Sequence, residues 1–142
     1  MTRVDFYFNA ADKLDVARKL AGKVFHAGQQ ALLYTADERL AHELDATVWT
    51  RDKLSFVPHV RCGHPLAKET PLLIGTDAEA LASPDVLINL DAVTPPCFGR
   101  FERLLEVVSQ DPEDRRLARE RFRYYKDRGY ELKTHDLAEK QA

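Results

Sequence analysis

Residues 4–34 read VDFYFNAADKLDVARKLAGKVFHAGQQALLY, and this stretch decides the fold. Apolar side chains occupy every second position at its start, which predicts a strand. Asp12 can then cap a helix whose apolar residues recur at helical spacing, and Gly28 stands just beyond that helix in the usual stop position. The apolar run at residues 31–34 predicts a second strand, so the stretch as a whole predicts a strand, a helix and a strand in succession.

The remainder of the chain continues this alternation. Thr35 and Glu38 match the capping box, in which each side chain bonds a free backbone N–H at the start of a helix. Asp111 and Pro112 predict the start of a last long helix, and Gly129 predicts its end. Further strands are predicted at residues 72–74, 86–90 and 105–108, with a short helix after Pro95-Pro96 and an extended edge at residues 130–132.

These elements predict an α/β fold, a single Rossmann-like domain with a mostly parallel sheet and helices on both faces. The chain has 142 residues, of which 44% are apolar, and is long enough to bury one hydrophobic core. We place this domain at residues 1–133. The polar residues 134–142 are expected to form a frayed C-terminal tail.

Composition excludes several classes of protein. A formal net charge of −2 gives the whole molecule no attraction for nucleic acid or anionic lipid, so any recognition of anions must be local. No apolar run is long enough to span a bilayer and the N-terminus lacks a leader pattern, so we expect a cytoplasmic protein. Cys62 and Cys97 are then expected to be reduced thiols.

The sequence offers little for catalysis. The turns after the first two predicted strands lack the glycines that let backbone N–H groups approach a phosphate. His59, Cys62 and His64 are residues of the kind that bind zinc, but no second pair of ligands follows at a recognisable distance, and we interpret the histidines as loop residues. No serine lies in a Gly-x-Ser-x-Gly elbow. We therefore expect no catalytic residue, no metal and no cofactor.

One basic segment stands out near the C-terminus. From residue 115 to residue 128, lysines and arginines are opposed only by Glu120 and Asp127. Two interpretations are open: a solvated basic face whose aromatic residue packs into the core, or a pocket in which arginines bind a carboxylate above an apolar ring. Because residues three and four apart are neighbours on a helix, one side of it would carry Arg115, Arg119, Phe122, Arg123 and Lys126.

Two aromatic residues elsewhere leave a similar choice. Trp49 is the only tryptophan, and it is either a core residue or an exposed anchor for a partner's side chain. Phe56 precedes Pro58 in a turn-rich stretch, where it either fills the core or contacts a partner.

Several motifs follow one another in a specific order. The sequence contains, from its start, FYF, LDATVW, SFVPH, DVLINL, EVV and LARERFRYYKDRGYEL. With these motifs the chain resembles the chi subunit of DNA polymerase III over almost its whole length, and SFVPH and the block that begins with ARER are the most specific of them.

The resemblance implies a non-catalytic accessory subunit of the DNA polymerase III holoenzyme, associated with the clamp loader and without a cofactor. Chi proteins bind the acidic, phenylalanine-ended C-terminal tail of single-stranded-DNA-binding protein, and many also bind the psi subunit. We accordingly expect a monomer in isolation, a heterodimer with psi, and contact with DNA only through these partners.

Residue roles follow from matching the motifs. Arg119 in ARER would bind the tail's terminal carboxylate, while Phe122 and Trp49 would flank its terminal phenylalanine. Arg115 and Arg123 would attract the aspartates before it. The family more often has tyrosine where this chain has Phe122, so a contact through a phenolic hydroxyl is not expected.

Phe56 in SFVPH matches the position through which chi proteins engage psi or a helicase that competes for the same surface. Two rival functions are a nucleic-acid-binding module that applies the basic helix directly to phosphates, and a small-molecule enzyme on the same fold. The second would need a polar constellation at the carboxyl ends of the strands.

Overall fold

The structure is a computed structural model that describes residues 2–50 and 58–140, except for the side chains of residues 47–50 and 139–140. Within these residues the strands are β1 (Arg3–Ala10), β2 (Ala31–Tyr34), β3 (His59–Arg61), β4 (Leu72–Gly75), β5 (Val86–Asn89), β6 (Arg103–Ser109) and β7 (Glu131–Asp136). The helices are α1 (Lys13–His26), α2 (Glu38–Thr50), α3 (Pro112–Asp127) and α4 (Leu137–Lys140), with short 3-10 helices at Ala67–Glu69, Ala78–Ala80 and Phe98–Arg100.

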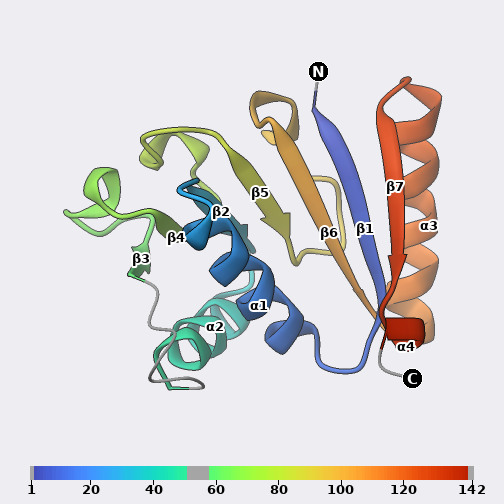
Figure 1. The fold of residues 1–142 in the computed structure, drawn as a ribbon, viewed down its shortest axis with the longest axis horizontal. Coiled ribbons are helices and arrows are strands. Elements are labelled where there is room, and N and C mark those ends of the chain that lie inside the picture. The colour runs from blue at the N-terminus through green and yellow to red at the C-terminus, as the bar shows by residue number, and fades with distance from the viewer. Residues whose placement is uncertain (1, 51–57, 141–142) are drawn as a thin grey trace.

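The strands form a single parallel sheet in the order β3-β4-β2-β5-β6-β1-β7. Helices α1 and α2 pack on one face of this sheet and α3 packs on the other, behind β7 in the view of Figure 1. The predicted α/β fold with a parallel sheet between helices is therefore confirmed.

Two hydrophobic cores lie on the two faces of the sheet. Residues 31–34 and 86–89 are buried throughout, because these central strands are covered on both sides, which explains their continuous apolar runs. Strand β1 alternates instead: Val4 and Phe6 belong to the core beneath α3, whereas Asp5 lies on the other face. This alternation determines which side chains of β1 can meet α3.

The predicted ends of α1 and α3 are confirmed. An Asp12 carboxylate oxygen accepts the backbone N–H of Asp15 at 3.2 Å. In the same way, an Asp111 carboxylate oxygen accepts the backbone N–H of Asp114, the third residue of α3, at 3.3 Å. Gly28 and Gly129 follow the two helices with φ values of +77° and +82°, a left-handed backbone that favours glycine.

The predicted capping box at the start of α2 is wrong. Asp37 caps this helix, since its carboxylate accepts the N–H groups of Arg39 at 2.9 Å and Leu40 at 3.4 Å. The Glu38 carboxylate instead accepts a hydrogen bond from Arg61 at 2.7 Å, which connects α2 to β3. Aspartate immediately before the first helical residue reaches these N–H groups directly, which makes a reciprocal Thr–Glu pair unnecessary.

The expectation of a frayed segment after residue 133 is also wrong for residues 134–140. Strand β7 continues to Asp136 beside β1, and the short helix α4 follows. The Asn9 side-chain amide, on a residue with φ of +63°, donates to the Asp136 carboxylate at 2.9 Å and fastens the two strand ends. Strand β7 is an edge strand and pairs only with β1, so its side chains are less buried than those of the central strands. Its polar sequence therefore lacks the apolar pattern by which a strand is predicted. The short strand β3 was likewise missed.

Truncation tests this correction. Deleting residues 134–142 should lower the free energy of unfolding by about 2 kcal/mol, because β1 loses half of its pairing with β7 and Asn9 loses Asp136. Urea denaturation monitored by circular dichroism measures the change. Equal midpoints for the full and the shortened chain would show that the segment contributes nothing to the fold.

Candidate functional site

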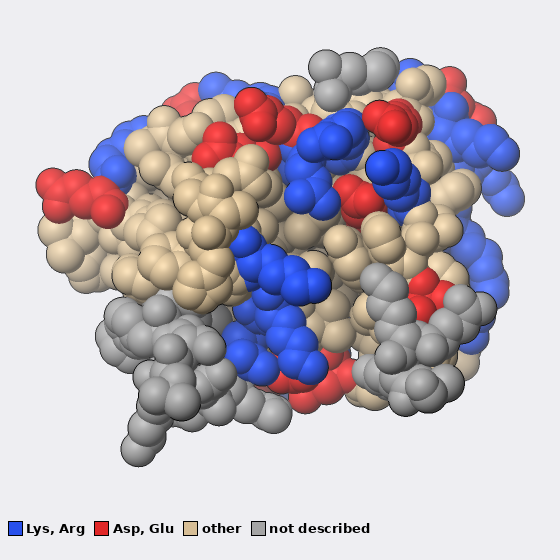
Figure 2. Space-filling model, in the orientation of Figure 1, with Lys and Arg blue, Asp and Glu red and all other residues tan. Residues whose placement is uncertain are grey.

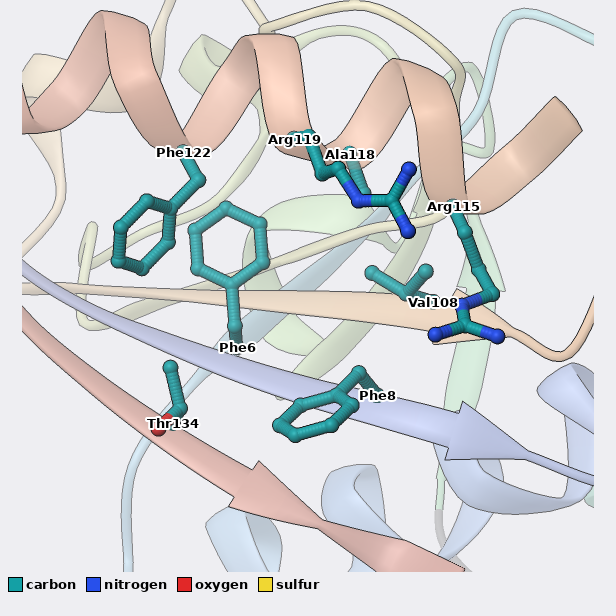
Figure 3. Close-up of a pocket in the computed structure, with 8 residues that line it drawn as sticks. All are labelled: Phe6, Phe8, Val108, Arg115, Ala118, Arg119, Phe122 and Thr134. Atoms are coloured by element: carbon teal, nitrogen blue, oxygen red, sulfur yellow. The ribbon is translucent and has the colours of Figure 1, made fainter. Parts of the chain in front are cut away.

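A hollow of about 220 Å³ lies between helix α3 and strands β1 and β7. It is lined by Phe6, Phe8, Val108, Arg115, Ala118, Arg119, Phe122 and Thr134 (Figure 3). We call this set of residues the α3 pocket.

The floor of the α3 pocket is apolar. Phe6 and Phe8 lie two residues apart on β1 and therefore point to the same face, toward α3. The Phe6 ring meets the Phe122 ring edge to face, with centroids 5.3 Å apart, and so closes one end of the hollow. Ala118 stands on α3 above this floor, where its small side chain leaves room that a larger residue would occupy.

The other end of the pocket is positively charged. Arg115 and Arg119 lie one helical turn apart, and Figure 3 shows both guanidinium groups beside Val108 at the end away from the Phe122 ring. In the part of the chain that the structure describes, neither arginine has an ion pair or a side-chain hydrogen bond. Both guanidinium groups are exposed and available to an anion.

Some other cations in α3 and at its C-terminal end have partners within the protein. Arg116 forms ion pairs with Glu113 at 2.6 Å and Glu120 at 3.1 Å. Arg128 lies 3.6 Å from the centroid of the Tyr124 ring, within the range of a cation–π contact. The basic segment of the sequence thus contains cations with internal partners, the two cations of the α3 pocket, and the exposed Arg123 and Lys126 outside it.

A buried polar network holds the adjoining, sheet-facing side of α3. Glu106 of β6 is fully buried and accepts hydrogen bonds from the Tyr125 hydroxyl at 2.6 Å, from Arg121 at 3.2 Å and from the Asn89 amide at 2.9 Å. Arg121 also donates to the carbonyl oxygen of Ala92 at 2.7 Å. We call Asn89, Glu106, Arg121 and Tyr125 the Glu106 network.

The electrostatics of this network follow from its burial. Desolvation raises the pKa of the Glu106 carboxyl, and the positive charge of Arg121 acts in the opposite direction. The pKa of the Tyr125 phenol is raised too, by burial and by the adjacent carboxylate. Because the Glu106 carboxylate accepts hydrogen bonds from two side chains of α3, the network fixes the rotation of α3 against the sheet.

The structure brings part of the predicted site together. Arg115, Arg119 and Phe122 line the same pocket, whereas Arg123 is exposed on α3 and does not line it. Trp49 belongs to α2, on the opposite face of the sheet, and its side chain lies outside the description.

Phe56, the predicted contact for a second partner, lies outside the described residues, so this prediction stays untested. The structure also adds pocket residues that sequence reasoning missed. The FYF motif does indicate that Phe6 and Phe8 share a face, but only the strand order places that face under α3. Thr134 was missed because it was assigned to the tail.

The histidine-rich segment has structural contacts. His59 is buried in β3, with its Nε2 atom 2.8 Å from an Asp45 carboxylate oxygen of α2. The His64 ring accepts the backbone N–H of Leu66 at 3.0 Å. Within the described residues, no three side chains of the metal-binding types converge on one point. In the same residues, no helix has both the length and the apolar character needed to span a membrane.

Comparison with known proteins identifies relatives over the whole fold. Residues 1–133 match the family described as DNA polymerase III chi subunit, HolC. The chain is 38% identical over 141 residues to DNA polymerase III subunit chi of Pseudomonas aeruginosa, covering 96% of this chain and 98% of the relative. It is 30% identical over 124 residues to the subunit chi of Haemophilus influenzae, covering 87% and 86%. The Escherichia coli protein of that name is 29% identical over 117 residues, covering 82% and 80%.

Solved structures show likeness of fold alone. The structure of Saccharomyces cerevisiae Dbp5 L327V bound to RNA and ADP BeF3 superposes with a TM-score of 0.66 at 15% identity, covering 96% of this chain and 41% of that chain. The C-terminal domain of the same variant, bound to Gle1 H337R and IP6, gives a TM-score of 0.64 at 15% identity, with 96% and 90% covered.

Mutation of the Glu106 network should affect stability in a graded manner. Tyr125→Phe removes one donor from a buried carboxylate and should lower the free energy of unfolding by about 1–3 kcal/mol. Arg121→Ala leaves that carboxylate without its ion pair and should cost more, about 3–5 kcal/mol. Chemical denaturation of both variants, with the exposed Tyr124→Phe as control, checks the order. If Tyr125→Phe were as stable as the control, the network would not hold α3.

Proposed function

This chain belongs to the DNA polymerase III chi subunit family, and on that premise we propose that it is an accessory replication protein whose α3 pocket binds the C-terminal tail of single-stranded-DNA-binding protein. The observation that supports the proposal most is the combination of an apolar floor with unpaired arginines at one end. A peptide that ends in phenylalanine presents the complementary groups, an aromatic ring and a free carboxylate on the same residue.

The ring and the carboxylate of that residue have separate positions in the pocket. The terminal ring lies over Phe6 and Phe8 beneath α3, and the terminal carboxylate lies between Arg119 and Arg115. Arginine suits this position because its planar fork can donate two parallel hydrogen bonds to a carboxylate. Thr134, at the β7 side of the hollow, supplies a hydroxyl for the peptide backbone.

Binding proceeds by electrostatic encounter followed by packing. The acidic residues that precede the terminal phenylalanine are attracted to the exposed arginines of α3, including Arg123 beyond the pocket. The apolar floor then supplies most of the residence time. A short segment that orders on binding gives roughly micromolar affinity, near −8 kcal/mol, and multiple tails on coated DNA add avidity.

The link to the rest of the replisome is a second part of the proposal. It rests on Phe56 in the SFVPH motif, by which this chain would bind psi or an equivalent partner. We propose that the protein is cytoplasmic and has an accessory rather than a catalytic role in the polymerase complex.

Replacing Arg119 tests the charged end of the pocket. Arg119→Ala should weaken binding of a tail peptide by about 2 kcal/mol, because the carboxylate loses its paired donor. Isothermal titration with a nonapeptide measures the loss. Arg116→Ala is the matched control on the same helix, since Arg116 is occupied by Glu113 and Glu120. Equal affinities for both variants would exclude Arg119 as the carboxylate site.

Filling the hollow tests its apolar end. Ala118→Leu places added bulk into a space of about 220 Å³ and should raise the Kd for the peptide at least tenfold, by steric exclusion of the terminal ring. Circular dichroism should show an unchanged fold, because the added atoms point into the hollow. Retained affinity in a folded Ala118→Leu protein would place the peptide elsewhere.

A further inference from the structure

Strands β1 and β7 are covered unequally on their two faces. Helix α3 covers one face, whereas on the other face α1 packs mainly on β2, β5 and β6 and the short helix α4 packs against the end of β1, so that much of β1 and β7 is left uncovered (Figure 1). The uncovered side chains alternate with those of the α3 pocket along the same strands. We call this set the open face: Arg3, Asp5, Tyr7, Glu131, Lys133 and His135, with Arg103 of β6 and Lys23 of α1.

The open face is hollowed. A depression of about 270 Å³ includes Arg3, Arg103 and Lys133 in its lining, and an adjoining one of about 180 Å³ includes Tyr7 and Lys23. Arg103 lines both depressions and so joins them into one trough. Figure 2 shows several lysine and arginine side chains on this face beside α1, with acidic side chains between some of them.

A buried carboxylate organises the middle of the trough. Asp5 is 6% exposed and accepts a hydrogen bond from Arg103 at 3.2 Å, and its other oxygen lies 3.1 Å from Nε2 of His135. The His135 ring stacks on the Tyr7 ring, with centroids 4.4 Å apart and planes 13° from parallel. Because a buried carboxylate is costly without partners, these contacts fix both the guanidinium group and the aromatic pair in place.

The charge of this trough differs from that of the whole chain. Arg3, Lys23 and Lys133 are exposed, and in the described residues none of them has an ion pair. With Arg103 they make four cations against the acids Asp5 and Glu131, an excess of two positive charges on a chain whose formal net charge is −2.

We propose that the open face binds single-stranded DNA, with phosphates on Arg3, Arg103 and Lys133 and a base stacked on the pair formed by Tyr7 and His135. Cations beside an aromatic platform are the combination by which proteins bind single strands without reading sequence. The choice of DNA over an acidic peptide rests on the proposed function, because a chain held by the tail of single-stranded-DNA-binding protein lies next to the strand. The two sites lie on opposite faces of β1 and β7, so one molecule has room for both ligands.

Tethering makes a weak contact sufficient. A chain held by the tail experiences a high effective concentration of DNA, so a Kd on the order of 100 µM at low salt still populates the contact. The basic helix α3 takes no part in this contact, which separates the proposal from a nucleic-acid-binding role of that helix.

Fluorescence anisotropy with a labelled oligothymidylate of about 15 nucleotides tests the proposal. The double variant Arg3→Glu/Lys133→Glu should raise the Kd at least tenfold and retain full affinity for the tail peptide. The matched variant Arg115→Glu/Arg119→Glu should abolish peptide binding and retain affinity for the oligonucleotide. An abasic strand of the same length should bind more weakly than oligothymidylate, because it lacks bases to stack.

The proposal would be overturned by no binding at low salt up to millimolar protein, by binding that the Arg3→Glu/Lys133→Glu variant retains, or by binding that disappears only with the α3 variant. An open face that binds an acidic peptide but no oligonucleotide would likewise refute it. Because tail binding is measured separately on the same proteins, failure of the DNA site is distinguishable from failure of the α3 pocket.

Discussion

The buried carboxylate of Glu106 is the constraint on which the arrangement of α3 depends. A fully buried charged group is tolerated only if its hydrogen-bonding capacity is satisfied, and here Arg121 and Tyr125 of α3 and Asn89 of β5 together satisfy it. Because Asn89 is fixed in the sheet while Arg121 and Tyr125 move with α3, all three hydrogen bonds form together only at one position and rotation of α3. That rotation presents Arg119 to the β1 side of the sheet.

The sheet edge gives the protein two faces of different character. Alternate residues of β1 point to opposite faces, so Phe6 and Phe8 form an apolar floor under α3 while Asp5 and Tyr7 contribute to a polar trough on the other side. Helix α3 turns the first face into a pocket with a charged end. On the second face the short helix α4 packs against the end of β1, and the rest of β1 and β7 forms an open trough rich in cations.

Much of this could be predicted from local signals. Apolar periodicity and end residues such as Asp12 and Gly129 predicted the strands and helices of the central fold, because these signals act within a few residues. Helical spacing alone put Arg115, Arg119 and Phe122 on one side of α3. The family resemblance supplied a role for that side, which the residues themselves left open between a solvated face and a pocket.

The unpredicted part depends on contacts between segments distant in the chain. Phe6 becomes a pocket residue only because β1 lies next to β6 and β7 under α3. Strand β7 lies at the edge of the sheet and has a polar sequence, so no apolar pattern around Thr134 predicted a strand there. Arg121 resembled its basic neighbours in sequence, yet it is buried on Glu106, a partner that no periodicity reveals.

A nuclear magnetic resonance titration of the isotope-labelled chain with a tail peptide tests the central claim most directly, since it reports where the peptide lies. The account predicts that signals of Val108, Ala118 and Thr134 shift together, and that a peptide without its terminal phenylalanine leaves them unchanged. Shifts confined to the α1 face, or an equal response to the shortened peptide, would contradict the account.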